Sequence, residues 1–122
     1  MKKLIHIVDD DASVRASLTE LLTSVGWAVE AFPSGKAFLD NCPQNNKRLS
    51  CLILDMTMPG MNGAEVQEWL HKQGVTFPTV VLTADPHCNL AKQAMARGAH
   101  SVLAKPCNPQ HLVATVATAM AP

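Results

Sequence analysis

Acidic side chains follow two short apolar segments of this sequence. Asp9 and Asp10 come directly after residues 4–8, and Asp55 comes directly after residues 51–54. A carboxylate at the point where a buried strand opens into a loop is poorly solvated from below and can be reached from above. Such a position suits a nucleophile or a metal ligand better than it suits a partner in a surface ion pair.

Two further residues extend this set. Thr83 follows another apolar segment, and Lys105 lies just beyond the last one. Three carboxylates in one place repel one another unless a cation neutralises them. Because the ligands would be oxygen atoms without Cys or His, the site favours Mg²⁺, with Mn²⁺ as a substitute. The hydroxyl and the ammonium group would complete a pocket for a phosphoryl group.

The elements that must position these residues can be read from the apolar pattern. Apolar runs of strand length alternate with longer segments in which apolar residues recur at spacings of three and four. We predict strands at residues 4–8, 28–31, 51–54, 79–83 and 101–104. We predict helices at residues 12–25, in a short segment after Ser34, and at residues 62–73, 89–97 and 109–120.

This alternation predicts an α/β domain with a parallel sheet covered by helices on both faces. Five strands suit an open doubly wound sheet rather than a closed barrel, which needs eight such units. In the expected strand order 2-1-3-4-5, ligands bind beyond the carboxyl ends of the strands, where all the singled-out residues lie. The fifth strand is at an outer edge, so a polar contribution from it needs a side chain as long as that of Lys105.

The composition narrows the function further. A chain of 122 residues fits a single domain spanning residues 1–122. Its 10 basic and 10 acidic residues cancel and aromatic residues are few, so we expect no nucleic-acid contact within this chain. The first apolar stretch ends at Asp9, too early for a signal peptide or a membrane span, which predicts a cytoplasmic protein without membrane contact. The four cysteines form no Cys-x-x-Cys pair, so we expect reduced thiols.

Several motifs together carry a family resemblance. They are Val8-Asp9-Asp10, Asp55 followed by Met58-Pro59-Gly60-Met61-Asn62-Gly63, Thr83-Ala84 and Lys105-Pro106. In type, order and strand placement they resemble the receiver domains of two-component response regulators, over essentially the whole chain. The resemblance implies a flavodoxin-like fold and a phosphoacceptor switch rather than an enzyme, one that assists its own phosphorylation and dephosphorylation.

The resemblance also implies roles for the site residues. Asp55 would accept the phosphoryl group in a Mg²⁺-dependent reaction. Asp10, Asp55 and the backbone carbonyl of Thr57 would bind the metal directly, whereas Asp9 would act largely through water. Thr83 and Lys105 would contact the phosphoryl oxygens, and the bond between Lys105 and Pro106 would be cis.

The same resemblance suggests partners. The phosphoryl donor would be a sensor histidine kinase or a phosphotransfer protein, and we expect it to dock near Val14, Arg15 and Leu18 of the first helix. A downstream effector domain or protein would recognise a changed surface around residues 89–97, 101–104 and 109–120, or a homodimer would form through the 89–119 face. The family often couples phosphorylation to an aromatic residue three positions before the lysine, but this chain has Val102 there, which predicts a modest surface change.

Three alternatives remain at this point. The first is a phosphorylation-independent adaptor with the same fold, to which Val102 gives some weight. The second is a Mg²⁺-dependent aspartyl phosphatase, but such enzymes resemble one another in placing an aspartate two residues after the nucleophile, and this chain has Thr57 there. The third treats the aspartates only as helix caps and surface charges, with Asp11 capping the helix that begins at residue 12.

Overall fold

The protein folds around one parallel sheet. A computed structural model describes residues 3–41, 49–74 and 78–121. In this part of the chain five strands lie in the order β2-β1-β3-β4-β5, and every neighbouring pair is parallel. The strands are β1 (Leu4–Val8), β2 (Ala28–Phe32), β3 (Leu49–Asp55), β4 (Thr79–Thr83) and β5 (Ser101–Ala104). The predicted fold class and strand order are confirmed.

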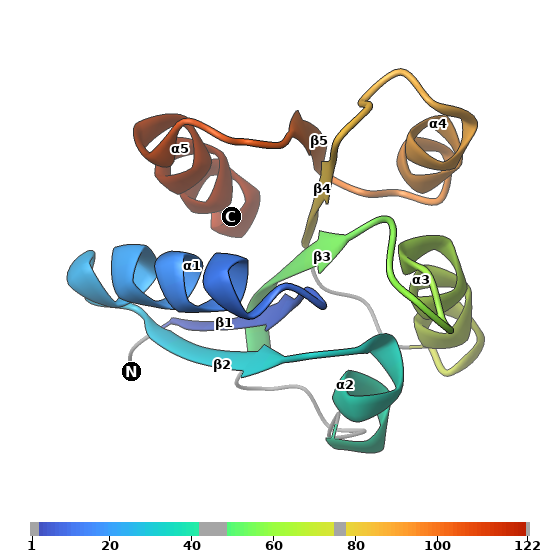
Figure 1. Cartoon of the computed structure of the whole chain (residues 1–122), viewed down its shortest axis with the longest axis horizontal. Helices are drawn as coiled ribbons and strands as arrows, with labels where there is room; N and C mark the ends of the chain where they lie inside the picture. Colours follow the sequence, from blue (N-terminus) through green and yellow to red (C-terminus); the bar gives the residue numbers. More distant parts are fainter. Residues whose placement is uncertain (1–2, 42–48, 75–77, 122) are drawn as a thin grey trace.

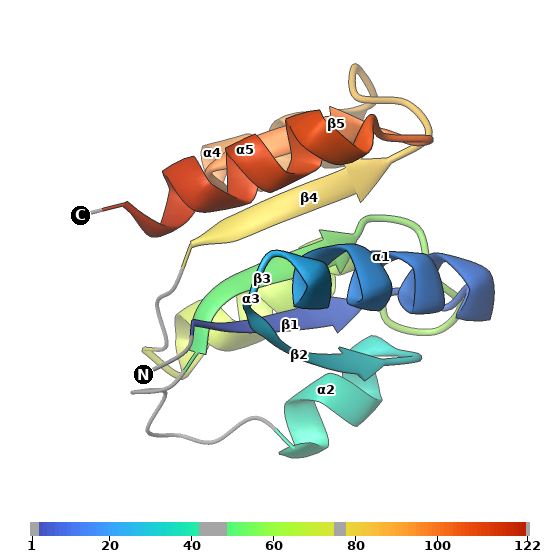
Figure 2. The same ribbon diagram turned by 90° about the vertical axis from the view of Figure 1, so that its left-hand side faces the viewer.

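Helices cover both faces of the sheet (Figure 1). They are α1 (Ala12–Ser24), α2 (Gly35–Asn41), α3 (Gly63–Lys72), α4 (Asn89–Ala96) and α5 (Pro109–Met120). α1 and α5 lie on one face, and α2, α3 and α4 lie on the other. The strands all point the same way in Figure 2, so their carboxyl ends share one edge of the sheet, from which α1 begins. No helix among the described residues is both long and apolar enough to span a bilayer.

The core has two layers because neighbouring strand residues point to opposite faces. Ile5 and Ile7 of β1 pack with Leu112 and Val116 of α5 in the layer beneath α1 and α5. Buried side chains on the other face pack beneath α2, α3 and α4, and include Val8, Phe38, Leu52, Leu54, Val66 and Leu70. β1, β4 and residues 51–55 of β3 are therefore buried on both faces, as their continuous apolar runs predict, whereas the outer strands β2 and β5 are only partly buried.

His6 is a buried polar residue on β1. Its ring contacts Phe32 and Phe38 edge to face, with centroid distances of 5.3 and 5.6 Å. Nε2 lies 3.2 Å from a carboxylate oxygen of Glu30, although neither ring nitrogen has a hydrogen bond of good geometry. Burial lowers the pKa of His6, and the Glu30 carboxylate opposes this shift only in part. The neutral imidazole therefore serves as a packing group in this layer.

Helix caps fix where the helices begin. The Asp11 carboxylate accepts hydrogen bonds from the N–H groups of Ser13 and Val14, at 2.8 and 3.2 Å, which confirms its predicted capping role. Asn62 and Glu65 form a reciprocal capping box at the start of α3. These caps fix where α1 begins after Asp9 and Asp10, and where α3 begins after the loop that follows Asp55.

Some predicted details were wrong. The second strand continues to Phe32 and the third begins at Leu49, so both are longer than predicted, and α1 ends at Ser24. The spacing of apolar residues in the first and fourth helices also predicts that Val25 and Met95 face the core, but they are 43% and 47% exposed. Val25 follows the last turn of α1, and α4 is short enough that Ala91 and Ala94 alone fill its buried side. The polar sequence of residues 44–48 predicts an exposed loop, but these residues lie outside the described ones.

Candidate functional site

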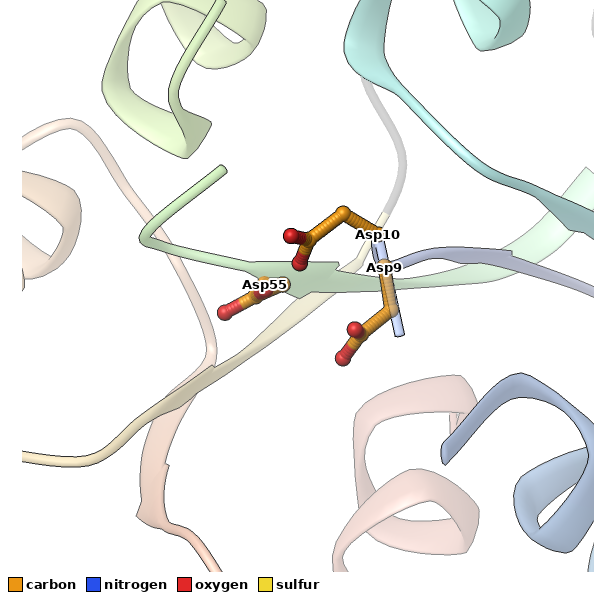
Figure 3. Close-up of side chains that lie close together, drawn as sticks. All are labelled: Asp9, Asp10 and Asp55. Carbon is orange, nitrogen blue, oxygen red and sulfur yellow. The ribbon is translucent and has the colours of Figure 1, made fainter. Parts of the chain in front are cut away.

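Three carboxylates meet at the carboxyl edge of the sheet. Asp9 and Asp10 follow β1, and Asp55 is the last residue of β3 (Figure 3). One oxygen atom from each of the three lies within 4.8 Å of the others. Asp9 and Asp55 are only 1% and 4% exposed, whereas Asp10 is exposed. The predicted convergence of acidic groups from two strands is therefore present.

Lys105 reaches this cluster from the loop after β5. Its Nζ atom lies 2.8 Å from Oδ2 of Asp9 and 3.3 Å from Oδ1 of Asp55. Burial lowers the pKa of Lys105, but the contacts with Asp9 and Asp55 outweigh this effect, and the pKa is raised above its usual value. The ammonium group is thus charged, and it bridges the two buried carboxylates.

Asp55 is destabilised in its ionised form. Burial raises its pKa to about 6, and the nearby negative charge of Asp9 adds to this shift. Lys105 and the N–H group of Thr57, which donates to Oδ1 of Asp55 at 3.3 Å, oppose it. One ammonium group therefore does not compensate for the crowded carboxylates. A divalent cation with oxygen ligands would supply the missing positive charge, and this donor set fits Mg²⁺.

Hydrogen bonds to its backbone and side chain fix the position of Asp9. Its N–H donates to the carbonyl of Phe32 at 3.1 Å, and its Oδ1 accepts from the N–H of Asp11 at 2.9 Å. Nη1 of Arg15 donates to the Asp9 carbonyl at 2.7 Å. From the sequence, we expected Arg15 only to lie where the phosphoryl donor docks. Its position one turn into the helix that follows the aspartates is the signal that could have placed it beside the acidic loop.

Thr83 and Thr57 lie beside the carboxylates in different ways. Thr57 is exposed and contacts Asp55 through its backbone N–H. Thr83 is buried at the end of β4, and its hydroxyl bonds to Asp85, accepting from the N–H at 3.2 Å and donating to the carbonyl at 3.4 Å. The structure thus brings Asp9, Asp10, Asp55 and Lys105 into one cluster and turns the Thr83 hydroxyl toward the loop before α4.

Close packing shapes the loop after Asp55. Gly60 has a φ of +80°, a conformation that favours glycine. A Cβ on Gly63 would lie 2.9 Å from the Asp55 carbonyl, so only glycine lets the start of α3 approach the end of β3 this closely. Met56 and Met58, whose sequence context favours packing over cofactor contacts, are buried in the core. The bond between Lys105 and Pro106 is cis, as the resemblance implied.

No cysteine or histidine among the described residues makes a hydrogen bond or ion pair with the three aspartates or with Lys105. Cys51 is buried, Cys88 and Cys107 are half-buried, and all three are free thiols. Cys42 lies outside the described residues. His87 is exposed on the loop before α4. A shallow surface hollow of about 790 Å³ runs along α1 beside Arg15, and none of the three site aspartates lines it.

Comparison with known proteins agrees with this geometry. Residues 5–117 match the family described as the response regulator receiver domain. The transcriptional regulatory protein FixJ of Bradyrhizobium diazoefficiens is 36% identical over 116 residues, which cover 95% of this chain and 56% of FixJ. The transcriptional regulatory protein TdiR of Thauera aromatica is 37% identical over 120 residues, which cover 96% of this chain and 51% of TdiR. The chain thus spans just over half the length of these relatives.

Solved structures show the same arrangement of elements. The response regulator StyR superposes with a TM-score of 0.89 at 38% identity, over 98% of this chain and 60% of StyR. The structure of FixJ-N also has a TM-score of 0.89, at 32% identity over 98% of this chain and 94% of that one. The chemotaxis protein CheY4 of Vibrio cholerae has a TM-score of 0.85 at 27% identity, over 98% of this chain and 99% of CheY4.

Proposed function

The chain belongs to the response regulator receiver domain family, and from this we propose that Asp55 is the residue on which it accepts a phosphoryl group. Receiver domains of two-component response regulators are phosphorylated on an aspartate and act as signalling switches rather than as classic enzymes. The observation that supports Asp55 is its place at the end of β3, buried beside Asp9 and within 3.3 Å of the Lys105 ammonium group.

The reaction needs little covalent chemistry from the protein. Asp55 attacks the phosphorus with one carboxylate oxygen, and the bond from phosphorus to the donor breaks as the donor leaves with its electron pair. Asp10, Asp55 and the carbonyl of Thr57 would hold Mg²⁺ directly, or Mn²⁺ in its place, and Asp9 would hold it largely through water. The bound cation supplies positive charge beside the transferring oxygens and offsets the repulsion among the carboxylates.

Lys105 and Thr83 act on the phosphoryl group itself. The Lys105 ammonium group, already at the carboxylates, donates to one phosphoryl oxygen, and the Thr83 hydroxyl donates to another. To do so the Thr83 hydroxyl must give up the hydrogen bond that it donates to the Asp85 carbonyl at 3.4 Å. Acceptance of the phosphoryl group would therefore loosen the loop before α4 and change the surface of α4, β5 and α5.

The lifetime of the phosphorylated form would depend on residues near the path of a hydrolytic water. Thr57 is exposed two residues after the nucleophile, and Asp85 lies on the loop after β4. We assign these two residues to the control of dephosphorylation, through which the domain assists both gain and loss of its phosphoryl group.

The partners follow from the same scheme. A sensor histidine kinase or phosphotransfer protein would dock at α1, where Val14, Arg15 and Leu18 are half-buried and accessible next to the acidic edge. An effector domain or protein would respond to the changed surface, or two copies would pair through the 89–119 face. Residues 1–122 would act as one receiver unit, without nucleic-acid contact of their own, in the cytoplasm.

Labelling with a small phosphodonor tests the assignment. The wild-type chain incubated with Mg²⁺ and acetyl phosphate should gain one hydroxylamine-sensitive phosphoryl group, and chelation of the metal should abolish the gain. Asp55→Asn should remove it, whereas Asp40→Asn, which changes an exposed carboxylate on α2, should not. Full labelling of Asp55→Asn at another residue would overturn the assignment.

The same experiment separates the alternatives. A phosphorylation-independent adaptor, to which the half-buried Val102 gives some support, would show no metal-dependent labelling. An aspartyl phosphatase would instead turn over small phosphate esters continuously. Stable labelling without ester turnover is the result expected of the receiver.

A further inference from the structure

Arg15 has a role at the acidic site that the family assignment alone does not supply. We infer that its guanidinium group holds the peptide between Asp9 and Asp10 in the orientation that lets Asp10 bind the divalent cation. Arg15 is thus a positioning residue and not itself a ligand. This inference rests on the proposed function, because it concerns the metal that the function requires.

The contact is short and comes from a rigid element. Arg15 lies in the first turns of α1, whose start is fixed by the Asp11 cap, and its backbone N–H bonds to the Asp11 carbonyl at 3.0 Å. From there Nη1 donates to the Asp9 carbonyl at 2.7 Å, within the range of a charge-assisted hydrogen bond. No carboxylate within the described ranges pairs with this guanidinium, so the carbonyl is its polar partner.

That carbonyl belongs to the peptide unit that joins Asp9 to Asp10. Fixing the plane of this unit fixes the direction of the N–Cα bond of Asp10, and so restricts the region that the Asp10 side chain can reach. The side chain of Asp10 needs this help, because it makes no hydrogen bond or ion pair with any residue that the structure describes. The carboxylates of Asp9 and Asp55, by contrast, are each held by Lys105 and by a backbone N–H.

The position of Asp10 therefore depends on its backbone. Its carboxylate nevertheless lies with the other two, close enough to share an ion (Figure 3). An exposed side chain without partners would otherwise sample several rotamers, and ordering it on metal binding would cost conformational entropy. A peptide already held by Arg15 removes part of that cost before the ion arrives.

Two effects of Arg15 on metal binding oppose each other. Its positive charge repels the cation, and removing one partly exposed, salt-screened charge would tighten binding by about fivefold at most. Removing a group that orients a metal ligand commonly weakens affinity by roughly tenfold or more. The sign of the change in Mg²⁺ affinity therefore distinguishes a positioning role from a simple charge effect.

Calorimetric titration of the full chain with Mg²⁺, without any kinase or phosphodonor, measures this directly. Arg15→Met keeps the aliphatic stem and removes the donor, and it should weaken Mg²⁺ binding about tenfold. Lys92→Met is the matched control, because it removes one positive charge from an exposed position on α4. Its affinity should stay within about twofold of the wild type. Unchanged or tighter binding by Arg15→Met would overturn the inference.

A second pair of variants tests whether Arg15 acts through Asp10. If it does, adding Arg15→Met to Asp10→Asn should change the already weakened affinity by less than about twofold. An undiminished tenfold loss in that background would mean that Arg15 acts elsewhere, and would overturn the inference.

Arg15→Lys provides a variant that keeps the charge and should be measured if Arg15→Met does not fold. Lysine is shorter and carries a single ammonium group, so Arg15→Lys should keep only part of the wild-type Mg²⁺ affinity. Full wild-type affinity would show that charge alone matters and would contradict the inference. If the wild-type chain itself bound no Mg²⁺, the proposed function would fail, and this inference with it. Binding by the wild type with no effect of Arg15 would overturn only the inference.

Discussion

At the scale of single residues, the site stores unfavourable electrostatic energy. Asp55 and Asp9 are buried next to each other, and Lys105 alone does not neutralise them, so the pKa of Asp55 rises to about 6. A residue selected only for folding stability would be uncharged at this position. The role that we propose for Asp55 as phosphoacceptor would account for a carboxylate at this position, as a trade-off between function and stability.

Because ionised Asp55 is unfavourable, we expect Asp55→Asn to stabilise the metal-free protein in a pH-dependent way. The folded pKa of about 6 lies above the value of 3.8 for an unperturbed carboxyl. Between pH 3.8 and about 6 the folded state binds more protons than the unfolded state. The contribution of Asp55 to stability is therefore fully present below pH 4 and is lost as the pH rises through 6. At pH 7.5 with chelator, Asp55→Asn should raise the free energy of unfolding by about 1–3 kcal/mol, measured by urea titration.

Two controls define this result. At pH 4 the gain from Asp55→Asn should nearly vanish, because the wild-type carboxyl is then protonated in the folded state. Asp40→Asn, which removes one side of the exposed pair with Lys36, should change stability by less than about 1 kcal/mol at either pH. A gain that is equal at both pH values would mean that ionisation of Asp55 is not its cause.

At the scale of elements, polar side chains join α3 to α4. Nε2 of Gln67 donates to the Ala94 carbonyl at 3.3 Å, and Nη1 of Arg97 donates to the Ala64 carbonyl at 3.4 Å. The alanines let the two helices approach closely enough for these contacts. Gln67 is buried, however, and its Oε1 has no hydrogen-bond partner among the described residues. This contact therefore includes an uncompensated polar atom.

We expect Gln67→Met to stabilise the protein. The change removes the buried oxygen and keeps the length of the side chain, and the Ala94 carbonyl keeps its bond from the Ala99 N–H at 3.0 Å. Desolvation of an unpaired polar atom costs about 1–3 kcal/mol and the lost hydrogen bond is worth about 1 kcal/mol, so the net gain should be about 1 kcal/mol. Thermal and urea unfolding would measure it, with the exposed Gln93→Met as control. A loss above 1 kcal/mol would mean that the amide contact dominates.

Most elements and the acidic cluster could be predicted from the sequence, for a physical reason. Apolar runs that are buried on both faces mark parallel strands, and the carboxyl ends of such strands must share an edge, which brings Asp10, Asp55 and Lys105 together. The contact of Arg15 with the Asp9 carbonyl and the burial of Gln67 were not predicted. Both depend on the path of a loop or the spacing between two helices, which side-chain periodicity does not encode.

At the scale of the whole molecule, the site and the expected output surface are joined through β4 and the loop after it. Thr83 ends β4, and its hydroxyl is the group that holds Asp85. Val102 on β5 is half-buried and packs against the cluster of small side chains beneath α4 that includes Ala94 and Ala99. A valine has a stiff χ1 and cannot swing out as a large aromatic ring can. A signal leaving this site would therefore move the loop and α4 more than residue 102.

Backbone amide spectra with Mg²⁺ and beryllium trifluoride, a phosphoryl analogue, test this route. The analogue should draw the Thr83 hydroxyl from Asp85, so the largest shifts beyond the site should fall on residues 85–96 with smaller ones on β5, while α2 stays unchanged. Thr83→Ala cannot make this exchange, so it should keep the shifts around Asp55 and lose those on α4. Asp55→Asn should show neither set. Shifts on α4 that persist in Thr83→Ala would mean that the signal reaches this helix by another path, because the loop would then respond without the hydroxyl that ties it to the sheet.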